Sequence, residues 1–256
     1  MSFLSLLDVE FKKIRRSKIL LILAVAVIAL WLPSMFNADM NFQMQAEGVS
    51  PENNFLIQGF LAMSWFIFPA SMVVSTVLLN QTERSSKGIV KMLALPISTA
   101  KLCLAKFTVL LALAAIQVLM SVGMYYLSAA IVTETQNYNF ILSSLFVFKV
   151  AGLLLLSSIP MLAIFWLLSV CIQTPIFSVG IGLASIVPSV LLINTKIWFA
   201  YPMAYPFFVI TAEYGRLAAN LNTAQIVLVP WLPVAACITI ICLLIACSCF
   251  GKAERR

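Results

Sequence analysis

The sequence contains no histidine. This absence excludes Ser-His-Asp triads, zinc hydrolases that depend on histidine ligands, and proton relays built from histidine. The sequence also has no GxxxxGK[ST] phosphate-binding loop, so the chain does not bind ATP in the manner of such loops. We therefore expect neither a catalytic site nor a metal site nor a cofactor in this chain.

Charged side chains are scarce as well, at 10% of 256 residues against 62% hydrophobic residues, and the mean hydropathy is +1.06. Such a chain has too little polar surface to coat a soluble globule of this size. We therefore expect an integral membrane protein. Because a patch that binds nucleic acid needs a solvated face, the net charge of +7 is first of all a signal of topology.

Apolar runs long enough to cross about 30 Å of hydrocarbon, which takes roughly 18 or more residues, occur six times. They are Ile19–Phe36, Phe55–Leu79, Phe107–Val132, Phe140–Ile172, Ile176–Ile193 and Ile226–Phe250. The fourth run is longer than a bilayer requires, so it tilts, kinks at Pro160 or begins outside the hydrocarbon. The sequence predicts an all-α protein with one membrane domain over residues 1–256 and no separate soluble domain.

Lys and Arg gather in three places along the chain, which hold thirteen of the sixteen basic residues. They are Lys12, Lys13, Arg15, Arg16, Lys18, Arg84, Lys87, Lys91, Lys101, Lys106, Lys252, Arg255 and Arg256. Segment 37–54 has no basic residue and carries Asp39, Glu47 and Glu52 instead. By the positive-inside rule, we expect both termini in the cytosol, as six spans require.

The segment before the first span is amphipathic. Leu4, Leu7, Phe11 and Ile14 recur at helical spacing, while the basic residues among positions 12–16 occupy the other face. This pattern predicts a helix that lies in the inner interface of the membrane. Each basic residue near an anionic leaflet contributes on the order of 1 kcal/mol, so anchoring alone explains the pattern, and docking to a partner is the alternative.

Ionisable residues within the spans are nearly absent, which argues against an ion-coupled secondary transporter. Lys149 is the exception, and it either snorkels to the outside or serves as a charge inside the membrane. The six cysteines have no metal-site spacing and are most simply small apolar residues. They are Cys103, Cys171, Cys237, Cys242, Cys247 and Cys249, and lipidation or a redox role for the last two is the alternative.

Segment Asn194–Gln225 is a long connection before the last span. Its apolar part, Ile197–Ala212, is interrupted by Pro202 and Pro206, so it is a poor single span. We expect two short re-entrant or interfacial helices on the outer side.

The fifth span contains small residues four positions apart, a spacing that lets two helix backbones approach closely. The pairs are Ser178 with Gly182, Gly180 with Ala184, and Ser185 with Ser189. They serve either packing within the subunit or an interface between subunits.

The cytosolic segment between the second and third spans is the most informative part of the sequence. Glu83–Ala94 has the pattern of a short amphipathic helix with an apolar strip of Ile89, Met92 and Leu93. Pro96 ends that helix, and Ser98 is a natural N-cap for the next one. Judged alone, this segment is either a solvated basic turn or a lever joined to two membrane helices.

The arrangement resembles the permease subunits of type-2 ABC exporters, in which an acidic-basic pair, a glycine, a leucine-rich stretch, Pro-Ile-Ser and a lysine follow the second span. The corresponding residues are Glu83, Arg84, Gly88, Leu93, Leu95, Pro96, Ile97, Ser98 and Lys106. The size and short outer loops are most similar to the lantibiotic-immunity permeases of that family.

The resemblance implies a permease that pairs with itself or a sister permease and with two copies of a separate ATPase, which binds ATP and Mg²⁺. Contact with the ATPase would come from Glu83, Arg84, Gly88, Ile89, Met92, Leu93, Pro96 and Ser98. The chain would then be a transport subunit rather than an enzyme. It would sit in the bacterial cytoplasmic membrane and expel a cationic antimicrobial peptide, which gives immunity or antibiotic resistance.

Acidic residues on the outer side are candidates for attracting such a peptide, although positive-inside bias also explains them. They are Asp39, Glu47, Glu52, Glu134 and Glu213. No substrate-binding residue follows from the sequence. Two alternatives stay open, namely an ABC permease for another cargo, such as a lipid or a small drug, and a membrane sensor or assembly protein that transports nothing.

Overall fold

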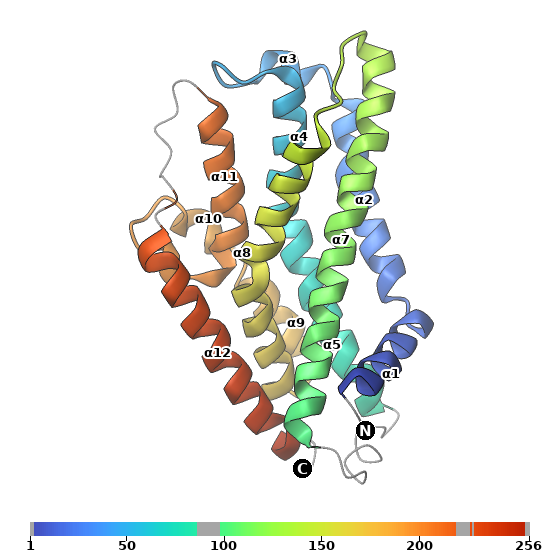
Figure 1. Cartoon of the computed structure of the whole chain (residues 1–256), viewed down its shortest axis with the longest axis vertical. Coiled ribbons are helices and arrows are strands. Elements are labelled where there is room, and N and C mark those ends of the chain that lie inside the picture. The colour runs from blue at the N-terminus through green and yellow to red at the C-terminus, as the bar shows by residue number, and fades with distance from the viewer. Residues whose placement is uncertain (1–2, 86–97, 219–225, 227, 254–256) are drawn as a thin grey trace.

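A computed structural model describes residues 3–85, 98–218, 226 and 228–253. Every regular element within these residues is helical, and six segments are long and apolar enough to cross a membrane. The predicted fold class and number of spans are therefore confirmed. Figure 1 shows an elongated bundle in which α1 (Phe3–Arg16) and the end of α12 (Leu228–Ala253) lie at the same end.

The first span, α2 (Ile19–Phe36), has the predicted bounds. The second is a continuous helical stretch of α4 (Pro51–Ala62), a π-helical turn η1 (Met63–Ile67) and α5 (Phe68–Ser85). The π turn ends two residues before Pro69, which has no N–H to donate to the preceding turn, and a missing bond of this kind favours local widening of the helix.

The third span, α7 (Thr99–Gln136), runs the full length of the bundle (Figure 1). It ends at Asn137, whose left-handed backbone (φ 49°) stops the helix. The fourth span, α8 (Ser144–Cys171), starts later than the predicted Phe140, because Phe140 folds back onto α7. Its carbonyl accepts the hydroxyl of Tyr125 at 2.9 Å. Pro160 lies inside α8 without ending it.

The fifth apolar run is long and apolar enough to cross a membrane, as predicted, but it is not one uninterrupted helix. It consists of α9 (Pro175–Ala184) and the single turn α10 (Ser189–Leu192), joined by turns. Pro188 has no N–H and cannot donate a backbone hydrogen bond to the Ala184 carbonyl. In addition, the Ser185 hydroxyl donates to the Gly182 carbonyl at 2.6 Å. Both features favour the break at this point.

Only some of the small residues of α9 pack inside the subunit. Ser178 and Gly182 are buried, and a Cβ added at Gly182 would lie 2.6 Å from Cγ1 of Val73 on α5. Gly180 is exposed, and a Cβ there would meet nothing within 4 Å. Ala184 is exposed as well. The pair of Ser178 and Gly182 therefore serves packing within the subunit, one of the two predicted uses. An interface between subunits stays a prediction for the face with Gly180 and Ala184.

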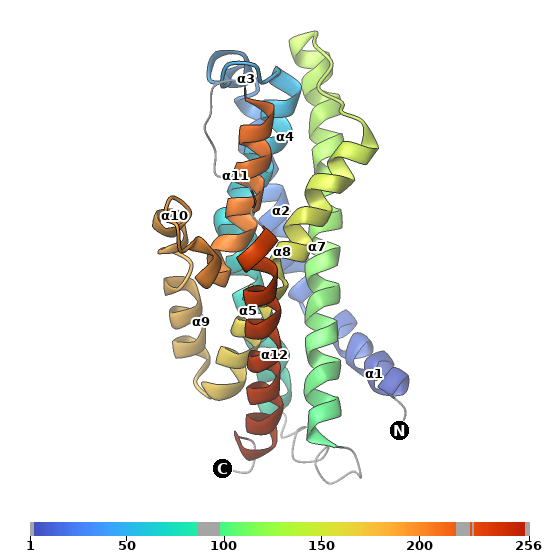
Figure 2. The same ribbon diagram turned by 60° about the vertical axis from the view of Figure 1, so that its left-hand side comes forward.

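Segment Asn194–Gln225 forms two 3-10 turns, η2 (Trp198–Ala200) and η3 (Pro202–Ala204), and one longer helix, α11 (Tyr205–Leu217). The prediction of two short helices is therefore correct only in part. In Figures 1 and 2, α11 runs beside α4 and α8 toward the end that carries α3 (Met40–Gln43). That this segment stays outside without crossing the membrane remains a prediction.

The core of the bundle is built around Trp31, which is fully buried. Its ring contacts Phe55 and Tyr125, with centroids 5.7 Å away in each case, and its Nε1–H donates to Ser121 Oγ at 3.0 Å. Gly59 leaves room for the indole, since a Cβ there would lie 2.5 Å from it. One side chain thus joins α2, α4 and α7.

Candidate functional site

The end of the bundle that carries α1 holds a buried ion pair. Lys106, in the second turn of α7, donates to Glu10 Oε2 at 2.9 Å, and Lys13 donates to Glu10 Oε1 at 2.7 Å. The side chains of Glu10 and Lys106 are only 2% and 1% exposed. This pair ties α1 to the start of the third span.

Local sequence explains why Glu10 faces α7. Leu6, Glu10 and Ile14 are spaced four residues apart, so they share one face of α1, and all three are buried. Of the predicted apolar stripe, Leu4 and Phe11 are exposed. α1 thus docks onto its own bundle with one face and leaves the outward apolar residues available to the membrane.

At this contact one carboxylate faces two ammonium groups. Burial acts to raise the pKa of Glu10, but the ammonium groups of Lys106 and Lys13 hold it below its ordinary value. A buried carboxylate without such partners would cost several kcal/mol, roughly. The sequence did not reveal this pairing, because 96 residues separate Glu10 from Lys106.

Ser98 is the N-cap of α7, as predicted. Its hydroxyl accepts the backbone N–H of Lys101 at 3.4 Å, which satisfies one of the unpaired donors at the start of a helix. The cap and the Glu10–Lys106 pair lie within the first two turns of α7. The start of α7 is therefore held in place through both its backbone and its side chains.

The other predicted coupling residues lie at or beyond the limits of the structure. Glu83 and Arg84 belong to the last turn of α5, next to the end at which α7 starts. Gly88, Ile89, Met92, Leu93 and Pro96 fall outside the described residues, as do Leu95 and Ile97 of the resemblance. Their contact with an ATPase stays a prediction.

Polar contacts hold α5, the helix that precedes residues 86–97, against its neighbours. The Asn80 amide donates to Ser169 Oγ on α8, and Ser71 Oγ donates to Gln117 Oε1 on α7 at 2.7 Å. All four side chains are buried. In an apolar environment such pairs are costly to break, so they hold α5 against α7 and α8.

In the upper half of the bundle, Lys149 pairs with Glu213. The distance between Lys149 Nζ and Glu213 Oε2 is 2.8 Å, and Arg216 bonds the other carboxylate oxygen at 2.8 Å. Burial acts to raise the pKa of Glu213, but these cations lower it below its ordinary value. The pairing joins α8 to α11, which the sequence did not indicate. Because the carboxylate is 4% exposed and engaged, Glu213 is no longer a candidate for attracting a peptide.

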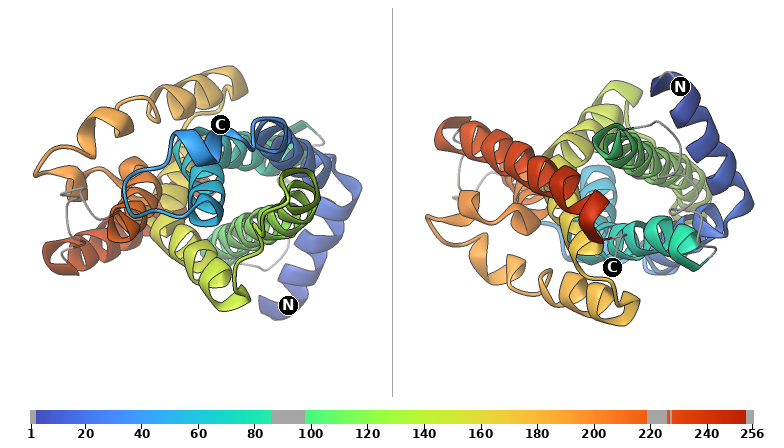
Figure 3. Two further views of the ribbon diagram at one scale, coloured as in Figure 1. Left: turned by 90° about the horizontal axis from the view of Figure 1, so that it is seen from above. Right: turned by 90° about the horizontal axis from the view of Figure 1, so that it is seen from below.

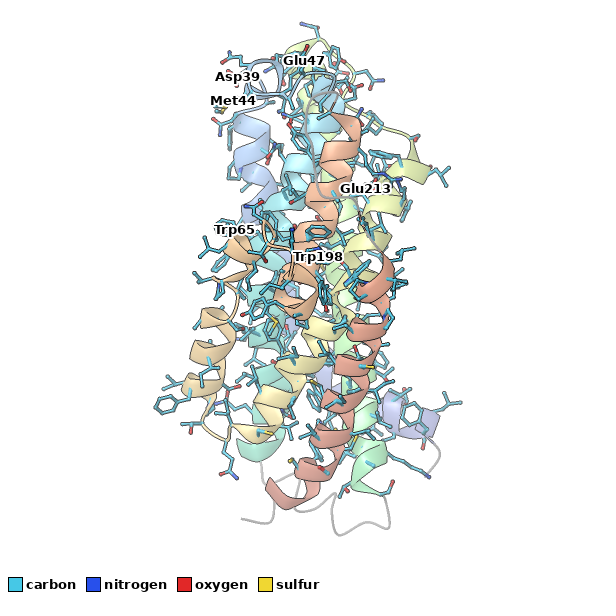
Figure 4. All side chains as sticks on the ribbon, turned by 90° about the vertical axis from the view of Figure 1, so that its left-hand side faces the viewer. Asp39, Met44, Glu47, Trp65, Trp198 and Glu213 are labelled. Atoms are coloured by element: carbon cyan, nitrogen blue, oxygen red, sulfur yellow. The ribbon has the colours of Figure 1, made fainter. Side chains whose placement is uncertain are left out.

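The other acids that we predict on the outer side differ in their exposure. Asp39, Glu47 and Glu134 are exposed, whereas Glu52 accepts hydrogen bonds from Ser50 Oγ and the Tyr138 hydroxyl, both at 2.6 Å. Figure 4 shows Asp39 and Glu47 near the upper end of the bundle, above Glu213.

The cysteines form no disulfide in the described part of the chain, and no group of three or more acidic or cysteine side chains there is arranged to hold a metal. Cys103 is buried and accepts the indole N–H of Trp166 at 3.3 Å, so it packs α7 against α8. Cys247 and Cys249 are half-buried on α12.

Comparison with known proteins identifies the family of the chain. No curated protein matches the sequence. The family described as ABC-2 family transporter protein matches residues 6–189, more than half of the chain, from α1 through the start of α10. Taken with the six apolar helices, this match shows that the chain belongs to the ABC-2 transporter family and is a multi-pass permease of an ABC transporter, the membrane component that associates with an ABC ATPase.

Proposed function

We propose that this permease belongs to an exporter that expels cationic, amphipathic peptide antibiotics of the lantibiotic type from a bacterial cytoplasmic membrane. The cell that carries it gains immunity or resistance. The peptide leaves the membrane for the outside and is not degraded.

The acidic end of the bundle is the observation that supports a cationic cargo. The connection between α2 and α4 contains no Lys or Arg, and it exposes Asp39 and Glu47 (Figure 4). Exposed Glu134 lies in the last turn of α7, and that helix ends at the same end of the bundle as α3 (Figure 1). Negative charge at the exit raises the local concentration of a cationic peptide.

Energy enters at the opposite end in this proposal. By the positive-inside rule, the basic residues of α1 and of the start of α7 favour a cytosolic position for that end, where two ATPase subunits bind ATP and Mg²⁺. ATP-driven closure of the two ATPase subunits pushes the segment Glu83–Ala94. The Glu10–Lys106 pair and the Asn80–Ser169 contact then pass the movement to α1, α7 and α8 as one body.

A second permease, identical or a sister chain, completes the transporter. Its contact surface is the open side of α9, which exposes Gly180 and Ala184. Beside them lies an apolar groove of about 390 Å³ between α5 and α9, with Val77 and Val179 in its walls. In Figure 3 this side faces away from α1.

The test is the partition of a labelled cationic peptide between cells and medium. Cells with the permease, its ATPase and any sister permease should survive the peptide better and hold less of it, while intact peptide accumulates in the medium. An ATPase that cannot hydrolyse ATP should remove the difference. Equal partition, or peptide recovered as fragments, would refute the proposal.

Two further measurements separate the alternatives. A panel of small drugs and labelled lipids on the same cells detects another cargo, which would keep the transporter and change only its substrate. Co-purification with an ATPase separates a transporter from a membrane sensor or assembly protein, since the latter needs none.

A further inference from the structure

A pocket opens at the end of the bundle that carries α3. Its volume is about 280 Å³, and it lies between the end of α2, α3 and the first two turns of α4. Four amide side chains and two methionines define it, namely Asn37, Met40, Asn41, Met44, Asn54 and Gln58. No charged side chain is among its lining residues.

The floor of this pocket is preformed. Asn41 and Asn54 are 8% and 3% exposed, and the Asn54 amide donates to Asn41 Oδ1 at 3.0 Å. The Tyr214 hydroxyl of α11 donates to Asn54 Oδ1 at 3.2 Å and accepts the backbone N–H of Ala46 at 3.2 Å. The floor is thus joined to the helix that precedes the last span.

The walls offer hydrogen-bond acceptors. The amide nitrogen of Asn37 donates to the Pro33 carbonyl at 2.9 Å, and that of Gln58 donates to Asn54 Oδ1 at 3.4 Å. In both cases the donor side of the amide is engaged within the chain. In the described part of the chain, no group donates to Asn37 Oδ1 or Gln58 Oε1, and both side chains are exposed.

The position of Gln58 supports a polar occupant. It lies seven residues below Pro51, which is about 10 Å down the helix axis. Its exposed side chain lies on a helix apolar enough to span a membrane, and a polar amide that faces hydrocarbon is costly unless water or a ligand satisfies it.

We propose that this pocket is the exit site for one end of the exported peptide, an inference that rests on the proposed function. A lysine ammonium or an amide N–H of the peptide donates to Asn37 Oδ1 and Gln58 Oε1. Met40 and Met44, 43% and 68% exposed, cover its apolar part with flexible side chains.

The chemistry of the pocket favours this ligand over others. Each of the four amide groups of the pocket already donates one N–H within the chain, whereas no described residue donates to the side-chain oxygens of Asn37 and Gln58, which favours a ligand that donates over an anion. A divalent cation prefers carboxylate ligands, and none lines the pocket. Sites that enclose a drug-sized molecule measure roughly 300–1,000 Å³, so this pocket accommodates one end of a peptide rather than the whole.

Opposite substitutions at one position test the site. Gln58→Leu removes the acceptor, whereas Gln58→Glu keeps an acceptor and adds a negative charge. We expect Gln58→Leu to weaken binding of a cationic peptide by about tenfold, the size of one hydrogen bond to a charged group, and Gln58→Glu to strengthen it. The same peptide with acetylated lysines should lose the gain from Gln58→Glu.

The controls are Gln43→Leu and Gln43→Glu, because Gln43 is an exposed amide on neighbouring α3 that does not line the pocket. Binding is measured by fluorescence anisotropy of a labelled peptide on the complete transporter in lipid nanodiscs without ATP. Basal ATP hydrolysis and gel-filtration profiles show that each variant is folded. Opposite effects at Gln58 and none at Gln43 support the site.

The outcomes separate this inference from the function beneath it. If the wild-type transporter exports the peptide but both Gln58 variants bind it as the wild type does, the pocket is not the exit site and the function stands. If Gln58→Glu and Gln43→Glu raise the affinity for the peptide equally, general charge attraction explains the effect, and the proposed site is overturned. A wild-type transporter that neither binds nor exports the peptide overturns both.

Discussion

Glu10 and Lys106 meet inside the protein, with 2.9 Å between Oε2 and Nζ, although 96 residues separate them. Glu10 lies on α1, and Lys106 lies near the start of α7. Because both are almost fully buried, neither charge has water as a substitute partner. The pair therefore fixes how α1 and α7 lie against each other.

Removing one partner should be more harmful than removing both. Lys106→Met leaves the Glu10 carboxylate with only Lys13, and we expect a loss of about 3–5 kcal/mol, whereas Glu10→Gln with Lys106→Met should recover much of it. Thermal unfolding in detergent and transport measure the effect. Asp8→Asn is the control, because its pair with Lys12 is exposed, and it should change little. Equal effects of the single and double variants would contradict the role of the pair.

The same pair predicts loss of stability in acid. The pKa of Glu10 in the folded protein is below its ordinary value, so the carboxylate contributes stability at neutral pH. That contribution begins to fall as the pH drops below about 4.3 and is lost as it passes through the folded pKa. Protease sensitivity of α1 at pH 7 and at acidic pH checks this. The Glu10→Gln, Lys106→Met variant should show a flatter dependence, and an identical one would exclude Glu10 as the group concerned.

Two glycines of α9 should respond differently to alanine. Gly182→Ala places a methyl group 2.6 Å from Val73 Cγ1, and overpacking of this kind costs about 1–3 kcal/mol. Gly180→Ala meets no atom within 4 Å and should leave the subunit stable. Melting temperatures of the purified permease distinguish them, and Val73→Ala should rescue Gly182→Ala. A failure of that rescue would locate the strain elsewhere.

Coupling to the ATPase should depend on the apolar strip of the cytosolic connection. Replacing Ile89, Met92 and Leu93 together by Asp should abolish transport and leave membrane insertion intact, because charge would be buried in an apolar contact. Charge changes at Ser2 or Ser5 serve as controls and should do little. Normal transport by the triple variant at normal expression would refute the lever.

Topology follows from the distribution of charge. In a cysteine-free background, a cysteine at position 254 should react with an impermeant thiol reagent only from the cytosolic side, and one at position 195 only from the outside. Reaction of position 254 from the outside would invert the arrangement and with it the assignment of the acidic end.

Several features depend only on residues that are close in the chain, and the sequence predicted them. A helix that crosses the hydrocarbon core needs an apolar run of sufficient length, so the number of spans and the bounds of Ile19–Phe36 follow from local composition. An N-cap needs one hydroxyl and the backbone three residues on, so Ser98 was predictable in the same way.

Other features were decided only by the packing of distant helices. A buried charge needs a partner, but the spacing of residues in the sequence does not identify a partner on another helix. Lys106 is such a partner for Glu10, and Lys149 is one for Glu213. The same holds for Gly182, whose neighbour Val73 decides which face of α9 is internal. Tertiary structure also assembled the amides of α2, α3 and α4 into one pocket, because the polar groups of separate helices meet only when those helices pack.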